Sequence, residues 1–254
     1  MNRAFQFLGK QIASYLAQEI FIKGSAPPSN PLHLQTTLRP GDVLLVEGNT
    51  RVSTAIKYLT QSTWSHAALY VGSHLADMGG NPNHCLVEAD TLRGVISSDL
   101  ERYSKMHTRI CRPAKIKSEE CRAITSYAIE KIGNQYDLRN IFDLARYLFP
   151  TPPIPTRFRR RLLSLGSGDP SQAICSTLIA QAFESIHYPI LADADRSRLE
   201  QGKDSYGQPQ IFPTKHHSLF TPRDFDVSPY FQIVKPTIES GFDFHQLEWI
   251  DTQK

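Results

Sequence analysis

Apolar and polar positions alternate in short runs between turn residues over much of the first half of the chain. Runs rich in Val, Leu and Ile that are bounded by Gly, Pro, Asn or Asp are typical of short β-strands. One example begins after the turn Pro40-Gly41-Asp42 and ends at Gly48-Asn49. The pattern predicts strands at 43–47, 64–72, 85–90, 94–96, 107–111 and 231–234.

A second set of segments repeats apolar residues every three or four positions, which is the period of an amphipathic helix. In the segment 173–183, Leu178, Ile179, Ala182 and Phe183 follow this spacing. Other helices are predicted at 1–23, 51–61, 118–132 and 139–149. Strands in a meander with flanking helices favour an α+β fold in which an antiparallel sheet packs against helices.

Turn-forming residues divide the chain into two predicted parts. Residues 24–31 are rich in Gly, Pro, Ser and Asn and are typical of a linker. We therefore expect residues 1–37 to form an amphipathic helix with its linker, and residues 38–254 to form the main domain. The helix has a polar face that is not strongly cationic, which favours packing on the domain over contact with a membrane or partner.

Composition and charge limit the classes of function. The net charge is +3, and aromatic residues are not interleaved with a basic stripe, so nucleic-acid binding is not expected. Four widely spaced cysteines form no C-x-x-C pair, which argues against a structural zinc site and favours reduced thiols. Without a long apolar run or a clear secretory signal, we expect a cytoplasmic protein.

Cys175 is the candidate nucleophile. It lies in the first turn of the predicted helix at 173–183, where free backbone N–H groups and the helix dipole stabilise a negative charge. A thiol in that position has a lowered pKa and is more often the reactive thiolate. The alternative is an inert buried side chain, because free cysteine is among the most buried residue types.

His66 and Glu88 are candidate partners for this thiol. If the strands at 64–72 and 85–90 pair as antiparallel neighbours, with Val71 near Cys85, Glu88 falls close to His66. A nucleophile, a base and an orienting acid form a recognisable set. The alternatives are a core histidine and a solvent-facing glutamate, both of which are common.

Four segments in this order resemble the permuted papain-like amidases. They begin at Pro40-Gly41-Asp42, Trp64-Ser65-His66-Ala67, Leu86-Val87-Glu88-Ala89 and Ile174-Cys175-Ser176-Thr177. More narrowly, the chain is similar to the YaeF/YiiX-like branch of the NlpC-type superfamily, distant kin of the lecithin:retinol acyltransferases. In this permuted group the histidine strand precedes the cysteine helix, as it does here.

The resemblance implies a role for each site residue. Cys175 would be the nucleophile, His66 the base and Glu88 the polar third member. Gly133-Asn134-Gln135-Tyr136 looks like the family's Gly-x-x-Tyr, so Tyr136 would lie near the developing oxyanion together with the Cys175 backbone N–H. Asp137 is a weaker candidate.

The chain departs from the ordinary superfamily in two places. Ile-Cys-Ser-Thr replaces Asp-Cys-Ser-Gly, and a long insertion covers residues 138–173. Peptidoglycan specificity is therefore not transferred.

We expect a cysteine hydrolase or acyltransferase that acts on an amide or ester through a thioester, without a metal or organic cofactor. Its substrate would be a small molecule, a peptide or a lipid-like molecule.

Two other functions compete with this one. A non-catalytic binding module would keep the fold without the activity. A metal-dependent hydrolase could use His216 and His217, although adjacent histidines lack the spacing of helical ligands. Peripheral membrane contact through the predicted helix at 1–23 or the arginine-rich segment Arg157–Arg161 is the alternative to packing on the domain. The oligomeric state is not indicated.

Overall fold

The computed structural model describes residues 15, 18–20, 28–90, 93–134, 174–191 and 220–246. The helix predicted at 139–149 and the whole insertion at 138–173 lie outside these ranges, as does most of the segment 1–23. The division into two parts at residue 37 therefore stays a prediction. None of the helices in the described ranges is long and apolar enough to cross a membrane.

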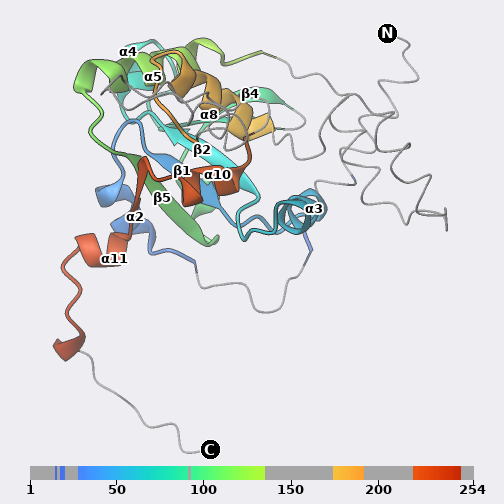
Figure 1. Cartoon of the computed structure of the whole chain (residues 1–254), viewed down its shortest axis with the longest axis vertical. Helices are drawn as coiled ribbons and strands as arrows, with labels where there is room; N and C mark the ends of the chain where they lie inside the picture. Colours follow the sequence, from blue (N-terminus) through green and yellow to red (C-terminus); the bar gives the residue numbers. More distant parts are fainter. Residues whose placement is uncertain are drawn as a thin grey trace, which may run out of the picture.

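Within the described residues, six strands form one antiparallel sheet in the order β4-β3-β2-β1-β5-β6. All six predicted strands are present, and the sheet with its flanking helices confirms the α+β class (Figure 1). The strands are β1 (Val43–Val46), β2 (His66–Tyr70), β3 (Leu86–Asp90), β4 (Gly94–Ser98), β5 (Thr108–Pro113) and β6 (Phe231–Val234).

The pairing of β2 with β3 agrees with the predicted register. Ala68 lies opposite Glu88, and the N–H of Val71 donates a hydrogen bond to the carbonyl of Cys85 at 2.8 Å. Gly72 leaves β2 with φ +58°, a left-handed conformation that glycine adopts without steric cost. The polar connection at 74–83 contains the short helix α4 (His74–Asp77). The Gly, Asn and Pro content of this connection does not predict a helix. The helix forms because the buried Leu75 anchors it in the core.

Helices begin at side chains that cap their free N–H groups. Asn30 caps α2 and Thr50 caps α3, each accepting hydrogen bonds from the first turn. The main helices are α2 (Pro31–Thr37), α3 (Arg51–Thr60), α5 (Ser118–Glu130), α8 (Ile174–Glu184) and α10 (Pro222–Val227). Shorter turns are η1 (Glu101–Tyr103), α11 (Pro236–Glu239) and η3 (Phe244–Gln246).

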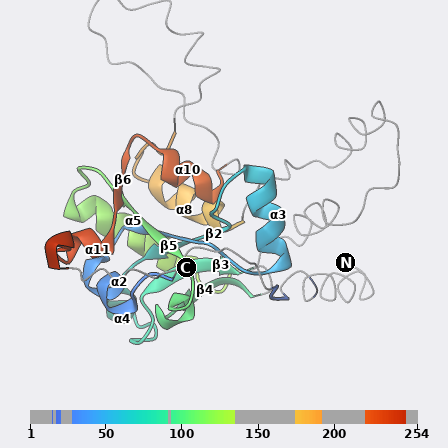
Figure 2. The ribbon, with the colours of Figure 1, turned by 90° about the horizontal axis from the view of Figure 1, so that it is seen from below.

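Two apolar clusters cover the two faces of the sheet. On one face α5 and α8 pack together over the central strands, and Phe183 is fully buried there (Figure 1). On the other face lie α2 and η1, where Leu34 and Tyr103 are buried (Figure 2). Ala67 belongs to the first cluster and Ala68 to the second, as the predicted alternation along β2 requires.

The segment just before β2 is tied to the C-terminal part of the chain. The Trp64 indole Nε1 donates to the Asp226 carboxylate of α10 at 3.0 Å, and Trp64 is buried. The Arg109 guanidinium on β5 pairs with the same carboxylate at 2.6 Å and lies over the Trp64 ring. These contacts fix the backbone at the point where His66 begins β2.

A buried ion pair joins the turn before β1 to β5. Asp42 is 1% exposed, and the Arg112 guanidinium contacts both of its carboxylate oxygens, at 2.9 and 2.7 Å. The Arg39 backbone N–H donates to the same carboxylate at 2.8 Å. Burial raises the pKa of Asp42, and hydrogen bonds from Arg112 and Arg39 act in the opposite direction.

We expect Arg112→Met to destabilise the protein by about 3–5 kcal/mol, because it leaves the buried Asp42 charge without its partner. Chemical denaturation at neutral pH measures the loss. The double variant Asp42→Asn/Arg112→Met removes both charges and should recover part of that stability. A single variant as stable as the wild type would contradict the assignment of this pair as a buried, coupled contact.

Candidate active site

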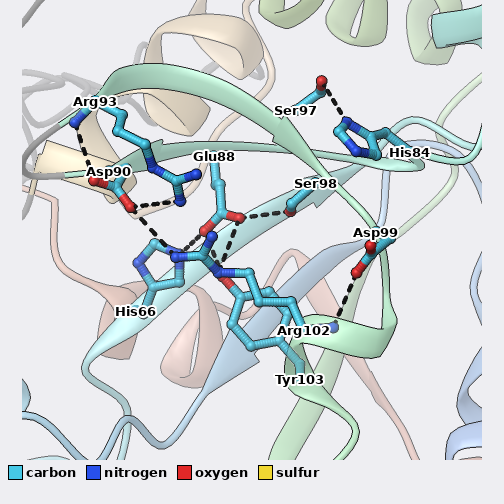
Figure 3. Close-up of polar contacts among 10 residues, drawn as sticks. All are labelled: His66, His84, Glu88, Asp90, Arg93, Ser97, Ser98, Asp99, Arg102 and Tyr103. Carbon is cyan, nitrogen blue, oxygen red and sulfur yellow. Dashed lines mark hydrogen bonds and ion pairs between the residues drawn. The ribbon is translucent and has the colours of Figure 1, made fainter. Parts of the chain in front are cut away.

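His66 and Glu88 are joined by a short hydrogen bond across β2 and β3. The distance from His66 Nε2 to Glu88 Oε2 is 2.6 Å (Figure 3). The Glu88 side chain is 1% exposed, whereas that of His66 is 22% exposed. The antiparallel register therefore brings together two of the residues that the sequence singled out. It also leaves the other imidazole nitrogen, Nδ1, free of the carboxylate.

Three further groups surround the Glu88 carboxylate. Ser98 Oγ donates to Oε1 at 2.5 Å, and the Tyr103 hydroxyl donates to Oε2, the oxygen that also contacts His66. The Arg102 Nε lies 3.7 Å from Oε1 and links Glu88 to Asp90 (Figure 3). A carboxylate buried with several donors remains charged without facing water.

Sequence reasoning missed these three partners. Ser98 lies on β4, two residues after the position paired with Glu88, so an explicit β3–β4 register would have suggested it. Arg102 and Tyr103 lie on the turn η1, and their approach to Glu88 depends on how this turn packs under the sheet. No local pattern in the sequence predicts that contact.

The pKa values of the pair move in opposite directions. Burial raises the pKa of Glu88, but hydrogen bonding and charge attraction from His66, with the hydroxyls of Ser98 and Tyr103, bring it down to about 2. Burial lowers the pKa of His66, but Cys175 and then Glu88 raise it to about 10. At neutral pH the pair is an imidazolium against a carboxylate.

Cys175 is the second residue of α8 and is 5% exposed. Burial raises its pKa, whereas the charge of His66 and a hydrogen bond with it, the Ala67 backbone and the Ser176 hydroxyl lower it, and the net pKa is lowered. Cys85, Cys111 and Cys121 have raised pKa values because burial dominates there. Of the four thiols, Cys175 alone has the electrostatic setting of a thiolate.

His66 connects the two faces of the sheet. Cys175 belongs to the apolar cluster beneath α8, whereas Tyr103 belongs to the cluster on the opposite face. As the first residue of β2, His66 interacts with Cys175 on one side and with Glu88 on the other. The arrangement of thiol, imidazole and carboxylate is the one that a cysteine nucleophile requires.

Other predicted residues lie outside the described part of the chain. They are Tyr136, Asp137, the segment Arg157–Arg161, His216 and His217. Gly133 and Asn134, which precede Tyr136, are bound to Val95 of β4 through backbone hydrogen bonds of 2.9 and 3.0 Å. Among the described residues, no group of three or more His, Cys, Asp or Glu side chains could hold a metal ion.

Comparison with protein families supports the resemblance to the permuted papain-like amidases that the sequence motifs indicate. The family of permuted papain-like amidase enzymes (YaeF/YiiX, C92 family) matches residues 37–147. Over this range the chain is similar to the permuted papain-like amidases. The matched range includes His66 and Glu88 and ends before Cys175. This match confirms the resemblance seen in the sequence and supports a hydrolase of the cysteine amidase kind.

Comparison with solved structures finds the metalloprotein yiiX from Escherichia coli O157:H7. The two chains share 14% sequence identity with a TM-score of 0.46, and the similarity covers 83% of this chain and 98% of that one. No curated protein matches the sequence.

Glu88 should make the free energy of unfolding depend on pH in the acid range. Because its folded pKa of about 2 lies below the ordinary glutamate value of 4.5, it stabilises the folded state above pH 4.5. That contribution, about 3 kcal/mol, should be lost as the pH falls from 4.5 toward 2.

Urea denaturation of wild type and Glu88→Gln between pH 2 and 7 measures this contribution. This pH range is chosen because it includes both the folded pKa of Glu88, about 2, and the ordinary value of 4.5. The stability difference between the two proteins should be large at neutral pH and shrink below pH 4.5. A difference that does not change with pH would show that Glu88 is not held as a carboxylate.

Proposed function

We propose that this protein is a cysteine-dependent amidase-like hydrolase or acyltransferase that acts through a thioester on Cys175. The observation that carries the proposal is the bond from His66 Nε2 to the buried Glu88 carboxylate. With Nε2 engaged, Nδ1 is the nitrogen available to the thiol. The lowered pKa of Cys175, with His66 among its causes, supports the same pairing.

In the first half of the reaction, the Cys175 thiolate attacks the carbonyl carbon of an amide or ester and forms a C–S bond. The tetrahedral intermediate collapses as the bond to the leaving nitrogen or oxygen breaks. His66 supplies the proton that this leaving group takes. The acyl group is then held on Cys175 as a thioester, and the imidazole is neutral.

In the second half, water or another nucleophile attacks the thioester carbonyl. The neutral His66 takes the proton of the attacking group, and the C–S bond breaks to regenerate the thiolate. Glu88 keeps the imidazole oriented and stabilises its charged form throughout. These side chains complete the cycle, so we propose no metal or organic cofactor.

The oxyanion of each intermediate needs donors. We propose the backbone N–H of Cys175, near the start of α8, as one donor, because helix N-termini favour negative charge. By resemblance to the family, the Tyr136 hydroxyl is the other. The substrate is proposed to be a peptide or a lipid-like acyl compound, met in the cytoplasm or at a membrane surface.

The proposal predicts a covalent acyl-enzyme. Wild-type protein mixed with p-nitrophenyl acetate, p-nitrophenyl decanoate or an aminoacyl p-nitroanilide, then quenched in acid, should carry the acyl group on Cys175 by peptide mass spectrometry. Cys175→Ala should carry none and should release no p-nitrophenol above the buffer rate. Cys85→Ala removes another partly buried thiol and should behave as wild type.

The same assay identifies the group that accepts the acyl chain from Cys175, which is either water or another nucleophile. Added hydroxylamine or a primary amine captures the acyl group if transfer competes with hydrolysis. The length of the preferred acyl chain separates a lipid-like from a peptide-like substrate. A folded wild type that forms no adduct with any donor would contradict the proposal and favour the non-catalytic binding module.

A further inference from the structure

One oxygen of Glu88 serves two donors. Oε2 accepts a hydrogen bond from His66 Nε2 and another from the Tyr103 hydroxyl, whereas Ser98 and Arg102 approach Oε1 (Figure 3). The imidazole and the phenol therefore share the same acceptor atom. The rings of His66 and Tyr103 also lie near each other, with centroids 6.0 Å apart.

Tyr103 is held where it is by contacts other than this hydrogen bond. Its side chain is 4% exposed and packs in the cluster with Leu34, Leu38 and Leu44. Its backbone N–H donates to the Leu100 carbonyl at 3.0 Å, which closes the turn η1. Because the ring is fixed by packing, the hydroxyl is presented to Oε2 from a defined direction.

The hydroxyl keeps its proton over the working range of pH. Burial and then the charge of Glu88 raise the pKa of Tyr103 well above its usual value. The phenol is therefore a permanent donor to a carboxylate that cannot donate in return.

We propose that Tyr103 is a positioning residue of this site, which acts on His66 through the Oε2 atom that both side chains share. The inference rests on the proposed function of His66 and Glu88 and adds a residue that sets how they interact. Tyr103 fills one side of Oε2, so the His66 N–H meets the carboxylate from the other side. It also withdraws part of the negative charge that the imidazolium would otherwise feel.

Several charged or ionisable groups lie around His66 and the Glu88 carboxylate, and they must be considered together. Cys175 approaches from α8, Glu88 from β3, and Arg102 and Tyr103 from the end of η1. Arg102 also pairs with Asp90 at 3.3 Å. Removing Cys175 eliminates the largest group that raises the pKa of His66, and the remaining contribution of the carboxylate side can then be measured.

The test follows the His66 imidazole by ¹⁵N NMR in Cys175→Ala, with and without Tyr103→Phe. Phenylalanine keeps the buried ring and removes only the donor. We expect the pKa of His66 to rise in the double variant, because Oε2 then holds the imidazolium more strongly. The share of the neutral tautomer with its proton on Nε2 should also change.

Tyr188→Phe is the matched control. It removes a tyrosine hydroxyl that donates to the Ala114 and Tyr230 carbonyls at 3.0 and 2.7 Å, outside the site. We expect it to lower thermal stability without moving the His66 titration. If Tyr103→Phe folds and leaves both the pKa and the tautomer of His66 unchanged, the inference is wrong.

With Cys175 present, Tyr103→Phe should slow acylation by about tenfold, as expected for a lost hydrogen bond to a charged group. The experiments distinguish a failure of the proposed function from a failure of the proposed positioning role of Tyr103. An inactive wild type whose His66 still responds to Tyr103→Phe contradicts the proposed function and keeps the positioning role. An active wild type whose His66 does not respond contradicts the positioning role alone.

Discussion

A buried carboxylate must be compensated, and the Glu88 side chain imposes this requirement on the structure around it. Glu88 lies almost fully buried on β3 and is approached by an imidazolium, two hydroxyls and a guanidinium. These donors come from three different places in the chain, which are β2, β4 and η1. The site is therefore formed by the tertiary fold and is absent from any isolated segment.

The fold supplies the rigidity that this arrangement needs. Trp64 and Asp226 fix the backbone before His66, and the antiparallel register sets Glu88 beside it. On the other face, α8 carries Cys175 toward the same imidazole. A strand end that contacts both faces of a sheet lets one histidine act between a thiol and a carboxylate, which is the basis of the proposed thioester chemistry.

The strands, the α+β class and the meeting of His66 with Glu88 could be predicted because they follow from local alternation and one hairpin register. The helix that carries Cys175 is visible in its apolar spacing. Tyr103 and Arg102 could not be predicted, since their contact with Glu88 depends on how η1 packs against the second cluster. The short helix α4 is hidden by its polar, glycine-rich surroundings, although Leu75 is buried.

The central claim is that His66 and Cys175 form an ion pair, and the pH dependence of Cys175 alkylation tests it most directly. Iodoacetamide rates at Cys175, resolved by peptide mass spectrometry, are compared between wild type and His66→Ala. The account predicts a wild-type thiol that titrates below the free value of about 8.5 and a variant in which this shift is lost. Equal, unshifted titration of the thiol in both proteins would contradict the pair.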